Sequence, residues 1–328
     1  MPQNNVKELI VTGPLQNVSV AYKNTNYIGD RVFRILDGID PKAKIAVYSK
    51  GAWFRNDAGI RGPGAQAKRS GFPIAEVSFS TDEYAFASEV TDEDRRFAKS
   101  KNAPPLAPDT DAVEFATDKI DLSKEVRVSA LVTGNVWADG NSGGEDAQGL
   151  WSPTGSTNTF LADIAKGVKA IQSTSGVTPN CLVIDFATYN SLKNCEELLD
   201  RIKYTQRGVF TKELLAALLE LEEILVGSAI VNTAKETKAG TEFTSKYIWE
   251  VNSGKGMGYL FHRPARPGRK TPAPGYQVRT AYEGGQPRRV TTWREAAAHQ
   301  DVYEVAEEAD MVLVDAALGY LWKDTFAD

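Results

Sequence analysis

One short stretch of the chain combines residue types that could carry out nucleophilic catalysis. Gly140-Asn141-Ser142-Gly143-Gly144 matches G-x-S-x-G, in which a hydrolase places its serine on a strained strand-to-helix turn beside an oxyanion hole. Here a further polar loop follows in place of a helix, and the two histidines, His262 and His299, lie in no supporting motif. We interpret this stretch as a loop, and a hydrolase using Ser142 is the enzymatic alternative.

Other patterns fall short of ligand sites. Residues 139–150 resemble an EF-hand loop, but Leu150 stands where that loop needs a bidentate glutamate. Residues 254–258 are glycine-rich yet lack the G-x-G-x-x-G spacing of a dinucleotide site. A late group of carboxylates is expected to form a solvated face or to bind basic partners: Glu304, Glu307, Glu308 and Asp310. We predict no catalytic residue, no metal site and no cofactor.

The overall composition is that of an ordinary globular protein made in a reducing compartment. The chain has 328 residues, enough for one large domain or two modest ones. No apolar run approaches the ~20 residues of a membrane span, and residues 1–10 lack the apolar stretch of a signal peptide. We therefore predict cytoplasmic synthesis and no membrane partner. Cys181 and Cys195 fit that compartment as small buried apolar residues.

Charge is distributed in blocks of opposite sign. The net charge of −5 argues against bulk attraction to nucleic acid. Residues 1–74 carry 11 basic and 5 acidic groups, whereas residues 75–125 carry 6 basic and 13 acidic groups. Residues 262–294 are again basic, and residues 295–328 are acidic. Such alternation suits a subunit that docks edge to edge with copies of itself, although patchy surfaces are also common.

An extended arm and a long hairpin are the first predicted elements. Residues 1–41 contain only short apolar groups between polar stretches, which is too little apolar surface for a core. Alternation of apolar and polar residues over 44–50 and 76–80 predicts two strands of a hairpin. The tip between them is rich in glycine, proline and basic residues. A polar tip of this length must lie in solvent or on another surface.

A long helix and a compact α/β region follow the hairpin. Asp109 or Thr110 can cap a helix that extends to about Leu131. Its apolar stripe and the positions beside it are Val113, Ala116, Ile120, Leu122, Val126 and Ala130. A connector rich in proline and arginine is expected at 263–275. The other expected segments are helices at 158–171, 189–199 and 211–219, and strands at 181–184, 224–231, 247–251, 258–262, 301–308 and 311–322.

The order of these elements resembles the major capsid proteins of tailed bacteriophages with the Hong Kong 97-type fold. Those proteins have an N-terminal arm, an extended hairpin called the E-loop, a long spine helix, an axial domain and a return to the peripheral domain. Several stretches are also similar in sequence: YAFASEVTDEDRR (84–96), DTDAVEFATDKIDLSKEVRV (109–128), residues 179–190, DRIKYTQ (200–206), EILVGSAIVN (223–232) and VYEVAEEADMVLVDAALGYLWKD (302–324). The resemblance covers nearly the whole chain, and none of these stretches is catalytic.

The resemblance implies an α+β fold with five parts and a structural function. The parts are an N-terminal arm (1–41), the E-loop (42–81), a first peripheral segment with the spine helix (82–133), an inserted axial domain (134–282) and a second peripheral segment (283–328). Subunits of this family self-assemble as pentamers and hexamers into an icosahedral capsid that encloses double-stranded DNA. The expected location is therefore the virion.

The E-loop of such proteins lies across a neighbouring subunit, and the charges here agree with that role. Residues 42–69 carry seven basic groups against only Asp57. We predict contacts with acidic residues of a neighbour, which set register more than strength because an exposed ion pair contributes only ~0–1 kcal/mol. The basic candidates are Lys50, Arg55, Arg61, Lys68 and Arg69. The acidic candidates are Glu89, Asp92, Glu93, Asp94, Asp109 and Asp111.

The resemblance also implies further partners and two departures from relatives. A portal protein is expected, whereas a scaffold or decoration protein is left open, and contact with packaged DNA should be weak. Because no asparagine follows Asn252, we predict none of the Lys–Asn isopeptide cross-links of some relatives. The length of 328 residues favours a separate scaffold, or none, over cleavage of an N-terminal segment. An encapsulin-type nanocompartment shell, which encloses protein cargo, is the alternative function.

Overall fold

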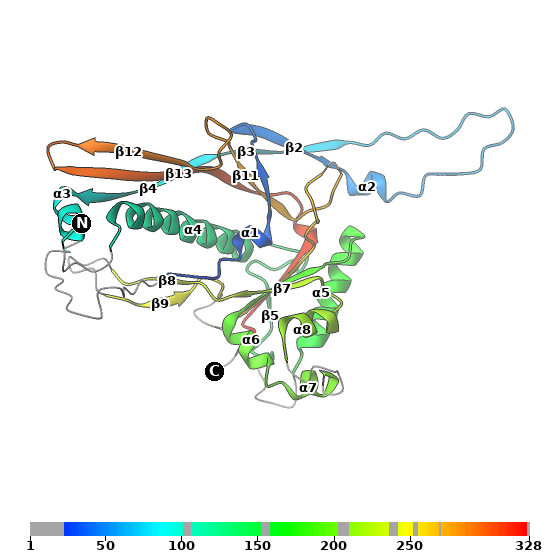
Figure 1. Ribbon diagram of the computed structural model, residues 1–328. Helices are drawn as coiled ribbons and strands as arrows, with labels where there is room; N and C mark the ends of the chain where they lie inside the picture. The colour runs from blue at the N-terminus through cyan, green and yellow to red at the C-terminus, as the bar shows by residue number, and fades with distance from the viewer. Residues whose placement is uncertain are drawn as a thin grey trace.

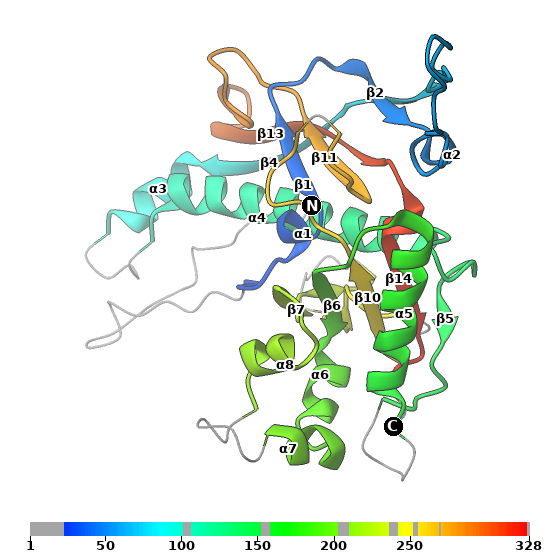
Figure 2. The ribbon, with the colours of Figure 1, turned by 90° about the vertical axis from the view of Figure 1, so that its right-hand side faces the viewer.

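The molecule consists of a long arm, a smaller lobe and a projecting hairpin (Figure 1). The computed structural model describes residues 23–100, 106–151, 158–202, 210–235, 242–251, 255–268 and 270–326. The arm is a sheet lying on one long helix, and the smaller lobe is a second sheet covered by short helices. Figure 2 shows the smaller lobe below the arm, with the base of the hairpin above.

The first sheet is built around one long strand near the C-terminus. β13 (Gln300–Leu313) pairs antiparallel with β4 (Asp82–Thr91) along one side. Along its other side it pairs antiparallel with β12 (Arg289–Glu295) and β11 (Gly275–Arg279). β1 (Arg34–Asp37) pairs parallel with β11. The sequence predicted two strands at 301–308 and 311–322, but the pairing continues through the expected gap and forms one 14-residue strand.

The long helix α4 (Pro108–Gly134) packs against both sheets. Its inward apolar residues are Ala112, Ala116, Ile120, Val128 and Val132. Val126 and Ala130, which were predicted to lie beside the apolar stripe, are exposed. Lys124 and Glu125 are buried on the inward face of α4, because Asp30 and the backbone of Ile28 in the N-terminal segment supply their polar partners. The apolar periodicity of the sequence is interrupted at this point for that reason.

The start of α4 also differs from the prediction, since neither Asp109 nor Thr110 is its cap. Pro108 is the first helical residue, a position where the missing N–H of proline would have had no helical partner. Ala107 takes the cap position, and its carbonyl accepts the N–H of Asp111 at 2.8 Å. The carboxylate of Asp111 accepts the Ala107 N–H at 3.3 Å in return. The side chain of Asp109 is therefore available for other contacts.

The second sheet is almost entirely buried, because helices cover both of its faces. Its strands, in spatial order, are β5 (Glu145–Asp146), β14 (Gly319–Lys323), β10 (Met257–Phe261), β6 (Cys181–Asp185) and β7 (Glu223–Gly227). The helices on one face are α5 (Phe160–Ser175), α6 (Phe186–Leu192), α7 (Glu196–Ile202) and α8 (Lys212–Leu218). The C-terminal half of α4 and the short α1 (Gly29–Val32) cover the other face. None of the helices that the structure describes could cross a membrane.

Two predicted elements are each divided in the structure. The helix expected at 189–199 is instead α6 and α7. The side chain of Asp185 caps the start of α6 by accepting the Thr188 N–H at 3.0 Å, and a turn in which the Asn194 N–H is donated to the Ser191 carbonyl separates α6 from α7. The strand expected at 224–231 becomes β7 and β8 (Ile230–Asn232), with β9 (Ser245–Tyr247) as the partner of β8. Local periodicity marked the segments correctly, but it could not place the turns within them.

Two strands do not follow the limits that the family resemblance implied. β14 lies within the expected second peripheral segment, yet it pairs with β10 in the second sheet. β11 lies within the expected axial segment, yet it pairs with β13 in the first sheet. Both pairings join residues far apart in the sequence, which alternation of side chains within one strand cannot indicate. The division into peripheral and axial parts remains a prediction.

Candidate assembly surfaces

The predicted hairpin is present, and its paired strands lie on the first sheet. β2 (Lys42–Tyr48) and β3 (Ile74–Ser80) are antiparallel, with Ile45 directly opposite Val77. These two side chains share one face, as the alternation in the sequence predicted. That face packs against apolar residues of β11 and β13, including the fully buried Val278. This contact fixes the direction in which the hairpin leaves the body.

The tip of the hairpin has little contact with the rest of the subunit. A short helix that the sequence did not predict, α2 (Lys50–Trp53), follows β2. Residues 54–73 then form neither helix nor strand, and all of their side chains are exposed except the half-buried Asp57. The side chain of Ile60 is fully exposed. Figure 1 shows this segment extending far from both lobes, so it presents its side chains to whatever lies beside the subunit.

The five basic candidates differ in how they are held within the subunit. Lys50 forms an ion pair with Asp315, which follows β13, with 2.7 Å between Nζ and Oδ2. Lys68 forms an ion pair with Asp57 across the tip, also at 2.7 Å. Three candidates form no ion pair with any residue that the structure describes: Arg55, Arg61 and Arg69. The charge of these three arginines is available to another molecule.

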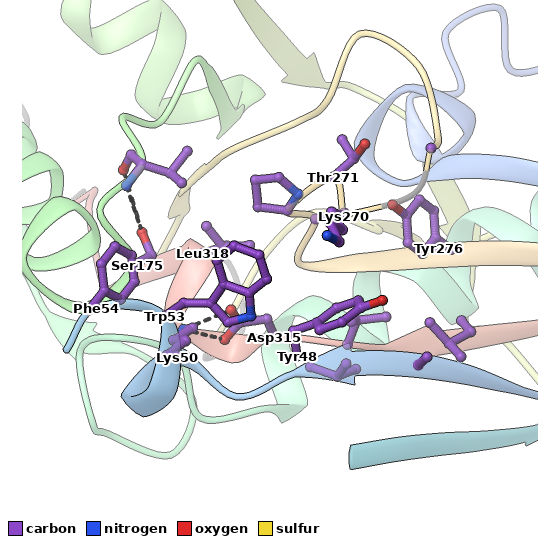
Figure 3. A pocket seen from close by; sticks show the side chains of 18 residues that line it. Tyr48, Lys50, Trp53, Phe54, Ser175, Lys270, Thr271, Tyr276, Asp315 and Leu318 are labelled. Carbon is purple, nitrogen blue, oxygen red and sulfur yellow. Dashed lines mark hydrogen bonds and ion pairs between the residues drawn. The ribbon is translucent and has the colours of Figure 1, made fainter. Parts of the chain in front are cut away.

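A cavity of about 380 Å³, here called the α2 cavity, lies where the tip leaves the paired strands (Figure 3). Its walls come from β2 and α2, the end of α5, the connector after β10 and the segment after β13. Aromatic lining residues are Tyr48, Trp53, Phe54 and Tyr276. The ammonium of Lys270 lies 4.9 Å from the centre of the Trp53 ring and 5.4 Å from that of Tyr48, close enough for cation–π attraction. The cavity therefore combines apolar walls with lysine cations.

Two of the acidic candidates are neutralised within α3 and its surroundings. In α3 (Asp92–Ala98), Asp92 forms an ion pair with Arg294 of β12 at 2.5 Å. Hydrogen bonding to Arg294 lowers the pKa of Asp92. Glu93 forms an ion pair with Arg96 one turn later, at 3.0 Å. The pair of Asp92 with Arg294 was not visible in the sequence, because the two residues are 202 positions apart.

Two further acidic candidates also have partners in the same subunit. Asp109 accepts hydrogen bonds from Arg95 at 2.6 Å and from the hydroxyl of Tyr303 at 2.8 Å. The bond from Arg95 lowers the pKa of Asp109. The carboxylate of Asp94 accepts the hydroxyl of Thr91, which caps α3, at 2.7 Å. Asp109 is therefore neutralised at the end of the arm, whereas Asp94 supports the cap of α3 and keeps its charge.

The remaining acidic candidates, Glu89 and Asp111, are exposed and form no ion pair within the described residues. Glu89 accepts the side-chain amide of Gln300 at 2.9 Å, and Asp111 accepts the Ala107 N–H. Glu89 lies near the end of β4, and Asp111 lies in the first turn of α4. In Figure 1 these ends are at the opposite side of the molecule from the hairpin tip. The tip therefore cannot reach them within one subunit.

An aromatic pair beside Asp111 was missed by the sequence reasoning. Phe115 of α4 is 51% exposed and Phe86 of β4 is 37% exposed. Their rings make an edge-to-face contact with centroids 5.8 Å apart. A signal was present in the sequence, because Phe115 stands between Glu114 and Ala116 and lies off the inward stripe of α4. An aromatic side chain in that place has no core to fill within its own subunit.

The sequence also gave no sign of a buried carboxylate that fastens the N-terminal segment, around residues 28 and 29, to α4. Glu125 accepts the backbone N–H groups of Ile28 at 2.9 Å and Gly29 at 2.6 Å, and the indole N–H of Trp249 at 2.5 Å. Burial raises the pKa of Glu125, and these hydrogen bonds act in the opposite direction. A side chain at position 29 would lie 2.7 Å from a carboxylate oxygen, so the glycine permits this approach. These hydrogen bonds therefore fix where the N-terminal segment joins the body of the subunit.

The loop 140–144 does not form a nucleophile elbow. Ser142 is exposed and makes an isolated bridge with Val136, and the chain continues into the two-residue strand β5 rather than into a helix. His262 contacts the carbonyl of Thr178 at 2.9 Å, and His299 lies between β12 and β13. Among the described residues, no three His, Cys, Asp or Glu side chains are grouped as metal ligands.

Comparison with known proteins finds one curated relative at the level of sequence. The major capsid protein of Burkholderia phage BcepMu is 26% identical over 246 residues, which are 74% of this chain and 75% of the relative. No protein-family model matches the chain. The similarity therefore extends over most of both proteins, although it is distant.

Solved structures share the fold over nearly the whole chain. A phage-related protein from Bordetella bronchiseptica RB50 has a TM-score of 0.64 at 20% identity, covering 94% of this chain and 95% of that one. The capsid of cyanophage P-SCSP1u has a TM-score of 0.61 at 12% identity, covering 97% and 93%. The holo-SrpI encapsulin complex from Synechococcus elongatus PCC 7942 has a TM-score of 0.52 at 12% identity, covering 94% and 93%. These similarities confirm the predicted α+β fold and the resemblance on which it rested.

Proposed function

We infer that this chain is a major capsid protein of the Hong Kong 97 type, a subunit that builds a shell with copies of itself. The similarity to a phage major capsid protein and the shared fold support this function. The observation that carries it is the hairpin tip, which has unpaired arginines and no surface of its own subunit to lie on. The role is structural, and we assign no catalytic residue.

In the proposed shell, the subunits form pentamers and hexamers around a double-stranded DNA genome. The smaller lobe, within residues 134–282, would meet its copies at the centre of each capsomer, and the long arm would form the periphery. β11 pairs with the first sheet and β14 with the second, and these pairings support boundaries near residues 274 and 318 in place of one at 282. A portal is expected as a further partner, and scaffold or decoration proteins are open.

Within a capsomer, the hairpin tip would contact the arm of the next subunit. Arg55, Arg61 and Arg69 supply the available positive charge, and Glu89 and Asp111 supply the available negative charge. Lys50, Lys68, Asp92, Glu93, Asp94 and Asp109 remain candidates, but each already has a partner in its own subunit. Complementary charges on opposite ends of one chain favour head-to-tail contacts, which form a ring where the rotation between neighbours closes.

An encapsulin-type shell is the second candidate, because an encapsulin shares the fold over nearly the whole chain. A phage capsid and an encapsulin differ in their contents. When the chain is expressed together with the products of its neighbouring genes, the purified particles should contain nuclease-protected double-stranded DNA if the phage function is correct. Particles that enclose a defined enzyme and no DNA would assign the encapsulin function.

The decisive experiment is to purify the full chain and to follow its assembly by size-exclusion chromatography and negative-stain microscopy. We expect closed particles of uniform diameter. In a variant in which a short glycine linker replaces residues 55–72, we expect folded subunits with an unchanged thermal unfolding midpoint but no particles. A wild-type chain that remains a solitary monomer under all assembly conditions would rule out the proposed function.

A further inference from the structure

We propose that Phe115 on α4 of one subunit fills the α2 cavity of the next subunit. This inference rests on the proposed function and names the partner of the hairpin at the level of side chains. Phe115 and the adjoining Phe86 form a protrusion on the arm, and the α2 cavity is the receptor. The occupant is thus a second copy of this chain.

The protrusion is apolar and exposed, with two carboxylates and one lysine beside it. Phe115 and Phe86 support each other through their edge-to-face contact. Exposed aromatic pairs of this kind mark interaction sites, because a soluble subunit gains nothing by keeping them in water. Asp111 and Glu114 flank Phe115 and form no ion pair among the described residues. Lys119, whose Nζ lies 5.1 Å from the centre of the Phe115 ring, is the single cation beside it in that stretch.

The receptor has the complementary properties. The α2 cavity measures about 380 Å³, near the lower end of the ~300–1,000 Å³ of pockets that hold a small ligand, so it suits one side chain rather than a whole helix. Rings of Tyr48, Trp53 and Phe54 line it, and aromatic side chains prefer such edge and offset contacts. Lys270 contacts two of these rings and no carboxylate within the described residues.

The backbone at the receptor shows a further feature typical of binding sites. Lys270 has a φ of +62°, a left-handed conformation that costs a non-glycine residue free energy. The surrounding turn holds it there, since the N–H of Thr271 is donated to the carbonyl of Gly268 at 3.3 Å. This geometry directs the Lys270 side chain over the aromatic lining. An acidic group arriving with Phe115 would meet an ammonium already in place.

Charge selects Phe115 over the other exposed apolar side chains of the arm. Val290 and Trp293 of β12 are exposed too, but they lie between Arg289 and Arg294. Both arginines are already paired with carboxylates of their own subunit, so β12 would bring no free negative charge to Lys270. The same objection applies to Ile60 at the hairpin tip, whose neighbour is Arg61. Phe115 brings the two carboxylates of Asp111 and Glu114 against the single cation of Lys119.

The two parts of this contact cannot meet within one subunit. Phe115 lies in the third turn of α4, and Figure 1 shows the start of α4 and α2 at opposite ends of the molecule. The remaining 19 residues of α4 alone span about 29 Å, at 1.5 Å per residue. The contact therefore requires a neighbour, and each subunit would contribute one protrusion and one receptor.

The first test compares Phe115→Ser with the matched control Val290→Ser, since Val290 is similarly exposed at 55%. Truncating a central aromatic anchor weakens an interface more than truncating a rim residue, so we expect the critical concentration for assembly to rise about tenfold or more for Phe115→Ser. We expect Val290→Ser to assemble like wild type. Both variants should keep the thermal unfolding midpoint of the wild-type subunit, which shows that folding is intact.

The second test locates the contact with paired cysteines. Lys119→Cys keeps Phe115 and its acidic neighbours, and Thr271→Cys lies in the wall of the α2 cavity. Mild oxidation of assembled particles carrying both substitutions should give a ladder of linked subunits, whereas Val290→Cys with Thr271→Cys should give monomers.

The outcomes separate this inference from the proposed function. Particles that form normally, with an unaffected Phe115→Ser variant and no ladder, overturn the inference and leave the shell function in place. A Lys119–Thr271 link within single monomers also overturns it. Failure of the wild-type chain to form particles overturns the proposed function and the inference together.

Discussion

Among single residues, Glu125 has the clearest effect on stability, because it accepts three hydrogen bonds in a buried place. Glu125→Ala leaves the donors of Ile28, Gly29 and Trp249 without partners, and each unsatisfied buried group costs about 1–3 kcal/mol. We expect the free energy of unfolding of the dissociated subunit to fall by about 3 kcal/mol or more in chemical denaturation. Glu114→Ala, on the exposed side of the same helix, should change it by less than about 0.5 kcal/mol. Equal values for both variants would contradict this role.

The raised pKa of Glu125 also predicts a pH dependence. The folded state binds the proton more tightly than the unfolded state, whose pKa is near 4.5. The contribution of this group to stability is therefore complete below that value and is lost as pH rises through the folded pKa. Glu125→Gln removes the titration. The free energy of unfolding of the Glu125→Gln variant, relative to that of wild type, should therefore increase from pH 4 to pH 8 in parallel denaturation series. A difference between the two proteins that stays constant with pH would show that Glu125 does not titrate in this range.

Charge-bearing candidates could be selected from the sequence, but their partners could not. Lys50, Asp92 and Asp109 carry the charges expected of contact residues. Lys50 and Asp92 are each bound to a residue more than a hundred positions away, and Asp109 is bound to Arg95. Such pairs depend on the tertiary fold, which composition and spacing do not encode locally. Phe115 shows the reverse case, since its place off the apolar stripe was visible and its significance needed the structure.

At the scale of elements, the hairpin is the part whose alteration should affect assembly without affecting folding. We expect the triple variant Arg55→Glu, Arg61→Glu and Arg69→Glu to form at least about tenfold fewer particles, because three lost or repelled pairs at ~0–1 kcal/mol each weaken every contact. Light scattering during assembly and particle counts by microscopy measure this effect. The charge-preserving variant with lysine at the same three positions should assemble nearly as wild type does. Normal particles from the glutamate variant would remove the basic tip from the interface.

Helices and strands whose apolar residues recur at a regular spacing were predictable, whereas the pairing of the strands was not. The hairpin strands, the long helix and the strand β6 follow directly from alternation, from helical spacing and from a continuous apolar run. The short helix α2 was not predicted because its four residues are too few for any period. The pairing of β11 with the first sheet and of β14 with the second could not be predicted, because strand order depends on long-range contacts.

At the scale of the whole molecule, the shell should be held by non-covalent contacts alone. No asparagine follows Asn252, so the late asparagine needed for a Lys–Asn isopeptide bond is missing. Assembled particles boiled in detergent should therefore migrate as one band near 35.8 kDa. A ladder of covalent multimers in the absence of added oxidant would contradict the prediction.

The overall architecture was predictable only through resemblance. Charge distribution favoured self-association, but composition and charge are compatible with many folds. The unsupported hairpin pointed to a partner outside the chain, since a polar tip between two good strands has no apolar surface for its own core. Residues 1–22 of the predicted arm and part of the 200–206 stretch lie outside the described residues, so their assignments stay predictions.

The ion pair between Lys50 and Asp315 occupies a junction, because Asp315 stands between the last residue of β13 in one sheet and the first residue of β14 in the other. The tip leaves the body beside this ion pair, at the junction of the two sheets. Residues 54–73 run out and back, so the tip reaches at most about 33 Å at ~3.3 Å per residue. A rotation of roughly 10° at the base of the tip would therefore displace its far end by about 6 Å. A slight change in the angle between the two sheets would thus be magnified into a swing as wide as a side chain is long.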